Sequence, residues 1–277
     1  DYGINNLIED SRDPVVIDKE LRVLHFRSRV DDAPIATLVN FQNHPESLCD
    51  RNRYISSDFV HDVRDAVENG VNRGGVSVAG LGGMALYING DVGGMQSPGK
   101  IQVFDVDGQQ ITETCGYTET VDDDFFSRAR AFGQLIGLDA LRILKDHGQA
   151  IDPEPWVFVS KSFLVPIENW GYHAMFLGEI FYRRDVYAFD RTKQISATNL
   201  PHLKTEVAAL LLGTVAGFTV PGELLPELYL GGYDGSATGP RQLVIDAWHN
   251  LVPEDARACE NVAECAAAPL AKNRQCV

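Results

Sequence analysis

The sequence lacks any long apolar run and lacks an excess of positive charge. None of its apolar stretches approaches the roughly 20 residues that a membrane-spanning helix requires. Lysine and arginine number 24 against 39 aspartates and glutamates, so the formal net charge is −15 at pH 7. Such a charge repels a phosphate backbone over most of the surface. We therefore expect no transmembrane segment, and nucleic acid and anionic membrane are poor candidate partners.

Cysteine is scarce, and its spacing excludes the common structural zinc sites. The five cysteines form no C-x2-C pair and have no histidine partners at zinc-finger spacing. Three of them, Cys259, Cys265 and Cys276, lie together near the C-terminus, which favours a disulfide there over reduced thiols. A disulfide and an acidic surface together indicate a secreted or periplasmic protein. The chain opens on Asp1 with neither Met nor a signal segment, so we expect a processed or excerpted chain.

What is present is a globular composition, with 44% hydrophobic and 23% charged residues in 277. Short stretches rich in β-branched or aromatic residues predict strands at Leu21 to Phe26, Ala36 to Phe41, Val76 to Ala79 and Ala85 to Asn89. Apolar residues at helical spacing predict a helix from Asp58 to Asn69, with Asp58 as its cap. A strand, a helix and a further strand in this order indicate a crossover unit.

A second helix is predicted from Asp123 to Asp146 by one continuous apolar stripe. After the proline-containing link at Asp152 to Pro155 the chain returns to strand-like segments, among them Thr214 to Val220. No flexible linker separates two independent domains. We therefore predict one α/β domain over residues 1–254, a layered mixed sheet flanked by helices, followed by an acidic, cysteine-containing tail over residues 255–277.

Three loops that follow predicted strands carry residues that can bind a metal or take part in catalysis. His44 follows the strand ATLVNF, and Glu223 follows TVAGFTV in a Pro-Gly-Glu turn. Between them, the loop NGDVGGMQSP carries glycines that let the backbone approach a ligand and present amides to an oxyanion. Singly, each loop is also typical of an ordinary turn. Together, imidazole, carboxylate, hydroxyl and free amides are the components of a metal-assisted hydrolase.

The residues of these motifs are similar to those of a known family. The runs are DPVVIDKELRVLHF, ATLVNFQNHPESL, ISSDFVHDVRDAVE, ALYINGDVGGMQSP and FTVPGELLPEL, in this order. In order and spacing they resemble the neutral/alkaline non-lysosomal ceramidase family and its bacterial relatives, over most of residues 8–231. The resemblance implies a ceramidase-like α/β catalytic domain and a zinc-dependent amidohydrolase that cleaves the N-acyl bond of a linear amide, a small molecule or a lipid.

The resemblance also implies the zinc ligands, which are two histidines, a glutamate and a tyrosine in that family. By position His44 corresponds to the second histidine and Glu223 to the glutamate. The first histidine belongs to a stretch upstream of Asp1, and the tyrosine has no match here. This chain then supplies half of a zinc site, so either a companion chain from the same precursor completes the site or the chain is a fragment.

The nucleophile is less well matched. The family places a serine in a loop of the form N-x-G-D-x-S-P, and Ser97 is the only serine before a proline in the corresponding loop. Without a gap, Gln96 takes the serine's place, and water activated by zinc is then the alternative nucleophile. Amides of Gly93 and Gly94 are expected to stabilise the tetrahedral oxyanion. Asp58 matches a family aspartate, either as a residue that orients the loop or as a simple helix cap.

Two other functional classes remain open. A metallophosphoesterase-like hydrolase uses GNH and GD motifs that NHPE and NGD resemble, but their order is reversed here and no D-x-H motif is present. A non-catalytic binding or assembly module that kept the fold fits the incomplete ligand set. For the substrate, the aromatic stretch from Trp170 to Phe189 either lines an acyl groove or belongs to the core. His61 and His173 are not expected to be ligands.

Overall fold

The computed structural model describes residues 7, 8, 10, 16–49, 52, 54–94, 98, 101–111, 126–178, 185–230, 243–245 and 251–253. The chain divides into two compact units. The first comprises Asp1–Gln149 and Glu223–Val277, and the second comprises Ala150–Gly222, which is inserted between the two parts of the first. The division begins next to the proline-containing link noted in the sequence. The single domain over residues 1–254 stays a prediction, and the tail over residues 255–277 lies outside the described residues.

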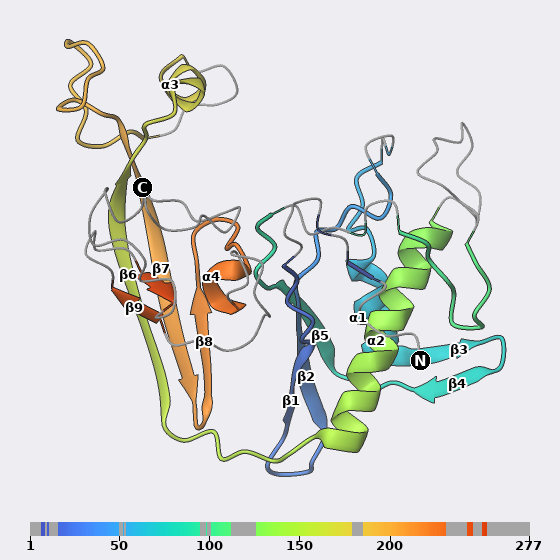
Figure 1. Cartoon of the computed structure of the whole chain (residues 1–277). Coiled ribbons are helices and arrows are strands. Elements are labelled where there is room, and N and C mark those ends of the chain that lie inside the picture. Colours follow the sequence, from blue (N-terminus) through green and yellow to red (C-terminus); the bar gives the residue numbers. More distant parts are fainter. Residues whose placement is uncertain are drawn as a thin grey trace, which may run out of the picture. The chain divides into compact units, whose positions relative to one another are not determined.

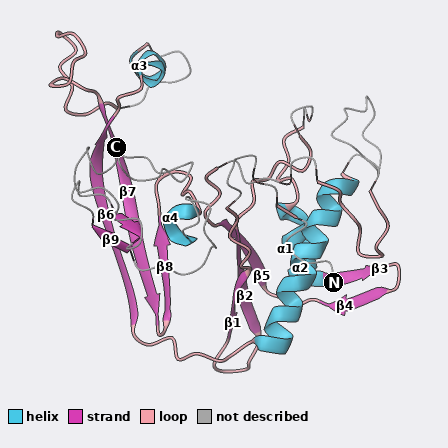
Figure 2. Ribbon diagram, in the orientation of Figure 1, coloured by secondary structure: helices cyan, strands magenta, loops and turns pink. Residues whose placement is uncertain are grey.

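The first unit is built on a mixed three-stranded sheet with the strand order β1-β2-β5 (Figures 1 and 2). Its main elements are β1 (Arg22–Arg27), β2 (Pro34–Phe41), α1 (Val60–Asn69), the β3 and β4 hairpin (Gly70–Arg73 and Val76–Ala79), β5 (Met84–Asn89) and α2 (Ser127–His147). β1 pairs antiparallel with β2, whereas β2 runs parallel to β5. Because α1 lies between these parallel strands in the chain, the predicted crossover is confirmed. The mixed sheet with its helices confirms the α/β class.

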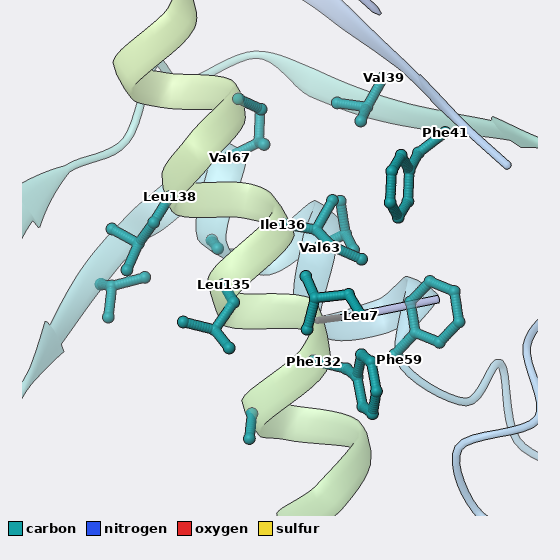
Figure 3. Packing of buried hydrophobic residues seen from close by; sticks show 14 of the residues in the cluster. Leu7, Val39, Phe41, Phe59, Val63, Val67, Phe132, Leu135, Ile136 and Leu138 are labelled. Carbon is teal, nitrogen blue, oxygen red and sulfur yellow. The ribbon is translucent and has the colours of Figure 1, made fainter. Parts of the chain in front are cut away.

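Helix α1 forms because its apolar residues fall on one side. Phe59, Val63, Ala66 and Val67 are all buried, as their spacing predicted. Figure 3 shows Phe59, Val63 and Val67 packed with residues of α2 and of the sheet. The ring of Phe59 lies 6.2 Å from that of Phe132, centroid to centroid. This single core, in which helices cover one face of the sheet, fixes the loops that leave the ends of β2 and β5.

Helix α2 begins at Ser127 in the described residues and ends at His147, close to the predicted range. Most of its predicted stripe is buried, including Phe132, Ile136 and Ala140. The helix approaches α1 at two small residues. A Cβ on Gly133 would lie 2.5 Å from the carbonyl oxygen of Phe59, so this crossing tolerates no side chain at that position.

The second unit is an antiparallel sheet with the order β6-β7-β8. Its elements are β6 (Trp156–Pro166), α3 (Trp170–Leu177), β7 (His202–Leu212) and β8 (Val215–Thr219). Helix α3 begins in the aromatic stretch, where Asn169 accepts a hydrogen bond from the Gly171 N–H at 2.8 Å. Trp170 is 81% exposed, so this ring is not in the core. His173 is buried, and its Nε2 bonds the carbonyl of Ile167.

The remaining described elements belong to the returning part of the first unit. They are α4 (Glu227–Leu230), β9 (Leu243–Ile245) and β10 (Leu251–Pro253), of which β9 and β10 pair antiparallel. None of the helices in the described part of the chain combines the length and the hydrophobicity that crossing a membrane requires.

Candidate functional site

His44 is placed by the segment that leaves the end of β2. The side chain of Gln42 is fully buried and donates to the carbonyl of Glu20 at 2.9 Å. Asn43 is also buried and donates to the carbonyl of Leu7 at 2.7 Å. These two amides anchor the backbone that follows the end of β2. His44 follows directly and keeps 17% of its side chain exposed, which leaves the ring accessible at the edge of the core.

Asp58 holds the loop that follows His44. Its carboxylate accepts hydrogen bonds from the N–H groups of Ser47 and Leu48, each at 3.0 Å, and from the Ser47 hydroxyl. It also accepts from the N–H of Phe59 at 2.7 Å. Asp58 lies at a φ of 54°, in the left-handed region that aspartate tolerates better than most residues. The predicted cap at Asp58 is wrong by one residue, because the helix begins at Val60 with Phe59 as its N-cap residue. The Asp58 carboxylate instead joins the His44 loop to the start of α1.

Glu223 reaches His44 although the two residues are far apart in the sequence. Oε1 of Glu223 lies 3.2 Å from Nε2 of His44, and both residues belong to the first unit. The Glu223 side chain is 63% exposed. The two residues that the sequence singled out therefore face one another, with His44 held at the core edge and Glu223 open to solvent.

The glycine loop after β5 holds the backbone next to Glu223. The N–H of Gly93 donates to the carbonyl of Leu224 at 2.8 Å. A Cβ on Gly93 would lie 2.6 Å from that carbonyl and 2.7 Å from the carbonyl oxygen of Glu223. The Gly93 amide, expected to face an oxyanion, is thus engaged with Leu224. Among the described residues the N–H of Gly94 has no acceptor, and Gly94 adopts a φ of 87°.

The strongest electrostatic feature near the site is the carboxyl group of Asp91, in the same glycine loop. Asp91 is 6% exposed. Burial, and next the negative charge of Asp18, raise the pKa of Asp91 to about 7, against a weaker opposing effect of Arg22. Near neutral pH this carboxyl group is therefore partly protonated. Sequence reasoning did not select Asp91 or Asp18, because an aspartate next to a glycine is usually a solvated turn residue.

The donor set of His44 and Glu223 fits two corners of a zinc site. A tetrahedral zinc ion binds imidazole nitrogen and carboxylate oxygen at about 2.0 to 2.2 Å, which separates two such donors by about 3.4 Å. The observed separation of 3.2 Å agrees with this requirement. Within the part of the chain that the structure describes, no group of three or more His, Cys, Asp or Glu residues is arranged to hold a metal ion. Further ligands have to come from elsewhere.

Two predicted features lie outside the described residues. Ser97, together with Gln96, lies outside the described residues, so the nucleophile stays a prediction. The cysteines of the predicted tail disulfide also lie outside them. Cys49 is the only cysteine among the described residues, and it is disulfide-bonded. His61 is exposed on α1.

Comparisons with known proteins find a distant structural similarity. No protein-family model matches the chain, and no curated protein matches it either. The solved structures that are similar to it include two ceramidases. One is the neutral ceramidase from Pseudomonas aeruginosa, at 16% identity and a TM-score of 0.43 over 75% of this chain. The other is a ceramidase complexed with C2, at 14% identity and a TM-score of 0.47 over 79% of this chain. The chain spans 35% and 40% of the length of these two proteins.

Proposed function

We propose that the chain is a ceramidase-like hydrolase that cleaves an N-acyl amide bond, with a zinc ion held by His44 and Glu223. The observation that carries the proposal is the 3.2 Å separation of Nε2 of His44 and Oε1 of Glu223. The two residues come from loops that the sequence motifs single out independently. A linear amide, lipid or small molecule, is the proposed substrate, and a secreted or periplasmic location is proposed with it.

Each part of the site has a task in this proposal. A zinc ion bound by His44 and Glu223 would act as a Lewis acid on the amide carbonyl. The N–H of Gly94 donates a hydrogen bond to the carbonyl oxygen as negative charge develops there. Gly93 instead holds the backbone next to Glu223, because its own N–H is bound to Leu224. In the overall reaction the amide C–N bond breaks, the acyl carbon gains hydroxide from water, and the leaving amine gains a proton.

The attacking group is either Ser97 or water, and one substitution separates the two. If Ser97 attacks, Ser97→Ala lowers kcat by a factor of 100 or more, on the order of the loss of a nucleophile, and abolishes any acyl-enzyme burst. If water attacks directly, the variant keeps kcat within a few-fold of the unsubstituted protein and no burst is seen in either protein. Rapid-quench kinetics on a chromogenic N-acyl amide measures both quantities.

The zinc proposal is tested by metal content and turnover of the intact assembly. We expect His44→Ala and Glu223→Gln to lose zinc, measured by mass spectrometry of metals, and amidase turnover together. His61→Ala is the matched control, because His61 is an exposed histidine on α1 and should keep both. Intact-mass analysis of the same sample reveals any companion chain. Turnover that persists in metal-free His44→Ala protein would contradict the proposal.

A non-catalytic binding or assembly module is the second candidate. The incomplete ligand set among the described residues favours it. It predicts that the intact assembly holds no zinc and hydrolyses no N-acyl amide, whereas His44→Ala leaves the affinity for a binding partner unchanged. The metal analysis above therefore separates the two candidates in one measurement.

A further inference from the structure

Asp18 and Asp91 are two buried carboxyl groups that interact with one another, and Asp91 lies in the glycine loop after β5. Asp18 is 1% exposed and Asp91 is 6% exposed. Asp18 precedes β1, and Asp91 follows the end of β5. The carboxylate of Asp18 accepts from the N–H of Glu20 and from Nη2 of Arg22, both at 2.9 Å. Two donors therefore point at the Asp18 carboxyl group.

Asp91 lacks comparable support for a negative charge. Its Oδ2 is buried and has no hydrogen-bond donor among the described residues. The charged groups that face it are the carboxylate of Asp18 and the guanidinium of Arg22, and the latter also binds Glu20 at 2.6 Å. Two ionised carboxylates cannot share a hydrogen bond, but a protonated Asp91 can donate one to Asp18. Geometry and charge thus favour one proton between the two groups, in agreement with the raised pKa of Asp91.

Asp91 is connected to the proposed zinc ligand Glu223 through Gly93 and Leu224. Asp91 and Gly93 belong to the same loop, and the N–H of Gly93 bonds the carbonyl of Leu224. The approach of Gly93 to the carbonyls of Glu223 and Leu224 is too close for any side chain. A displacement of the loop therefore displaces the backbone that carries Glu223 and changes its distance from His44.

We propose that Asp18 and Asp91 are a positioning pair in which one shared proton holds the glycine loop, and through Gly93 holds Glu223, in the geometry of the site. When the proton is lost, two buried negative charges repel one another and the loop moves away from Leu224. This inference rests on the proposed function for its catalytic consequence, but the coupling between the proton and the loop is a property of the described residues alone.

The direct test is hydrogen exchange of the Gly93 amide in the full chain, followed by NMR as a function of pH. After correction for the intrinsic exchange rate, we expect its protection to fall at least tenfold between pH 6 and pH 8.5. In Asp91→Asn the protection should stay constant, because the amide still donates to Asp18 and does not titrate. Asp139→Asn is the matched control, since burial also raises the pKa of Asp139, which belongs to α2 and not to the glycine loop. It should follow the unsubstituted protein.

A second variant keeps the test independent of the folding of Asp91→Asn. In Asp18→Asn the neighbour is neutral and can both accept and donate, so the loop stays bonded in either state of Asp91 and the pH dependence of protection should flatten. Protection of Gly93 that falls equally in Asp91→Asn, Asp18→Asn and the unsubstituted protein would overturn the proposal. So would constant protection in all three.

The pH profile of kcat/KM then separates this proposal from the proposed function. If both hold, kcat/KM falls above about pH 7 in the unsubstituted protein and less steeply in Asp91→Asn. A pH-dependent loss of protection without any amide hydrolysis supports the positioning pair and contradicts the proposed function. Amide hydrolysis combined with unchanged protection across pH supports the function and overturns the positioning pair.

Discussion

At the scale of single residues, the candidate site depends on side chains that do not themselves perform chemistry. Asp58 collects three backbone N–H groups from the His44 loop and from the start of α1. The Asp58 side chain is buried, so these bonds are made away from solvent. The loop that follows His44 is thus held by polar bonds to Asp58, whereas the backbone at Glu223 is held through Gly93.

Asp58→Ala should lower the free energy of unfolding by about 3 kcal/mol, because it leaves buried N–H donors without an acceptor. Alanine is also less tolerant than aspartate of the positive φ at this position. Urea denaturation measures the loss. The control Asp65→Ala removes an exposed carboxylate from α1 and should change the value by less than about 0.5 kcal/mol. Equal midpoints for the two variants would show that Asp58 does not hold the loop.

Gly93→Ala should disturb the site, because the added Cβ meets the carbonyls of Glu223 and Leu224. We expect a loss of about 1 to 3 kcal/mol of stability from overpacking, and a zinc affinity lower by about tenfold or more. Urea denaturation and competition with a zinc chelator measure the two effects. Gly75→Ala is the control, since nothing lies within 4 Å of a Cβ at that position. A Gly93→Ala protein that matches this control in both assays would refute the close contact.

At the scale of elements, a substitution where α1 and α2 cross shows whether steric contact or helix propensity has the larger effect on stability. Gly133→Ala gains about 1 kcal/mol from propensity alone. In this structure, however, the Cβ would collide with the carbonyl of Phe59 and the side chain of Asp62. We therefore expect a net loss of about 1 to 2 kcal/mol in urea denaturation. Lys145→Ala, at an exposed position of the same helix, should stay within about 0.5 kcal/mol. A stabilised Gly133→Ala protein would show that the helices pack less closely.

Much of the fold was predictable because burial repeats with the period of each element. The apolar positions of β2 and α1 recur every 2 or 3.6 residues, and the buried residues agree with them. The short strand β3 escaped prediction because Val71 is its only fully buried residue. Helix α3 escaped because its residues are apolar on all sides and show no period. The division into two units depends on contacts between distant segments, which local patterns do not contain.

The site was predictable only in part. The order and the residues of the motifs selected His44 and Glu223. Their contact, however, depends on how the chain returns to the first unit. The hydrogen bond from Gly93 to Leu224 was not foreseen, because a glycine loop does not reveal where its amides point. The pairing of Asp91 with Asp18 was not foreseen either, since burial of an aspartate cannot be read from its neighbours in the sequence.

At the scale of the whole molecule, buried acids make stability depend on pH. Burial raises the pKa of Asp62, Asp91 and Asp139. Each of these groups keeps its proton in the folded state at a pH where the unfolded chain has lost it. Folded protein then binds more protons than unfolded protein, so the free energy of unfolding falls as the pH rises. For Asp91 the fall extends from about pH 4, the ordinary value, to about pH 7.

We therefore expect urea denaturation to show lower stability at pH 8 than at pH 5. Asp62→Asn, Asp91→Asn and Asp139→Asn combined should flatten this profile, while Asp146→Asn, which removes one exposed charge, should leave its slope unchanged. His25 acts in the opposite sense, because burial lowers its pKa and favours the folded state as the pH rises through about 6.5. A combined variant with the original slope would show that the buried acids do not control the profile.

The insertion of Ala150–Gly222 between the two parts of the first unit also sets an order of events during biosynthesis. His44 leaves the ribosome long before Glu223 does, with the whole second unit translated in between. At about 5 to 20 residues per second, the interval is roughly 10 to 35 seconds. The nascent chain therefore displays its histidine loop without Glu223 for that time, and the candidate site can close only after the second unit has been translated. A formed contact between His44 and Glu223 therefore requires that the second unit has already been translated.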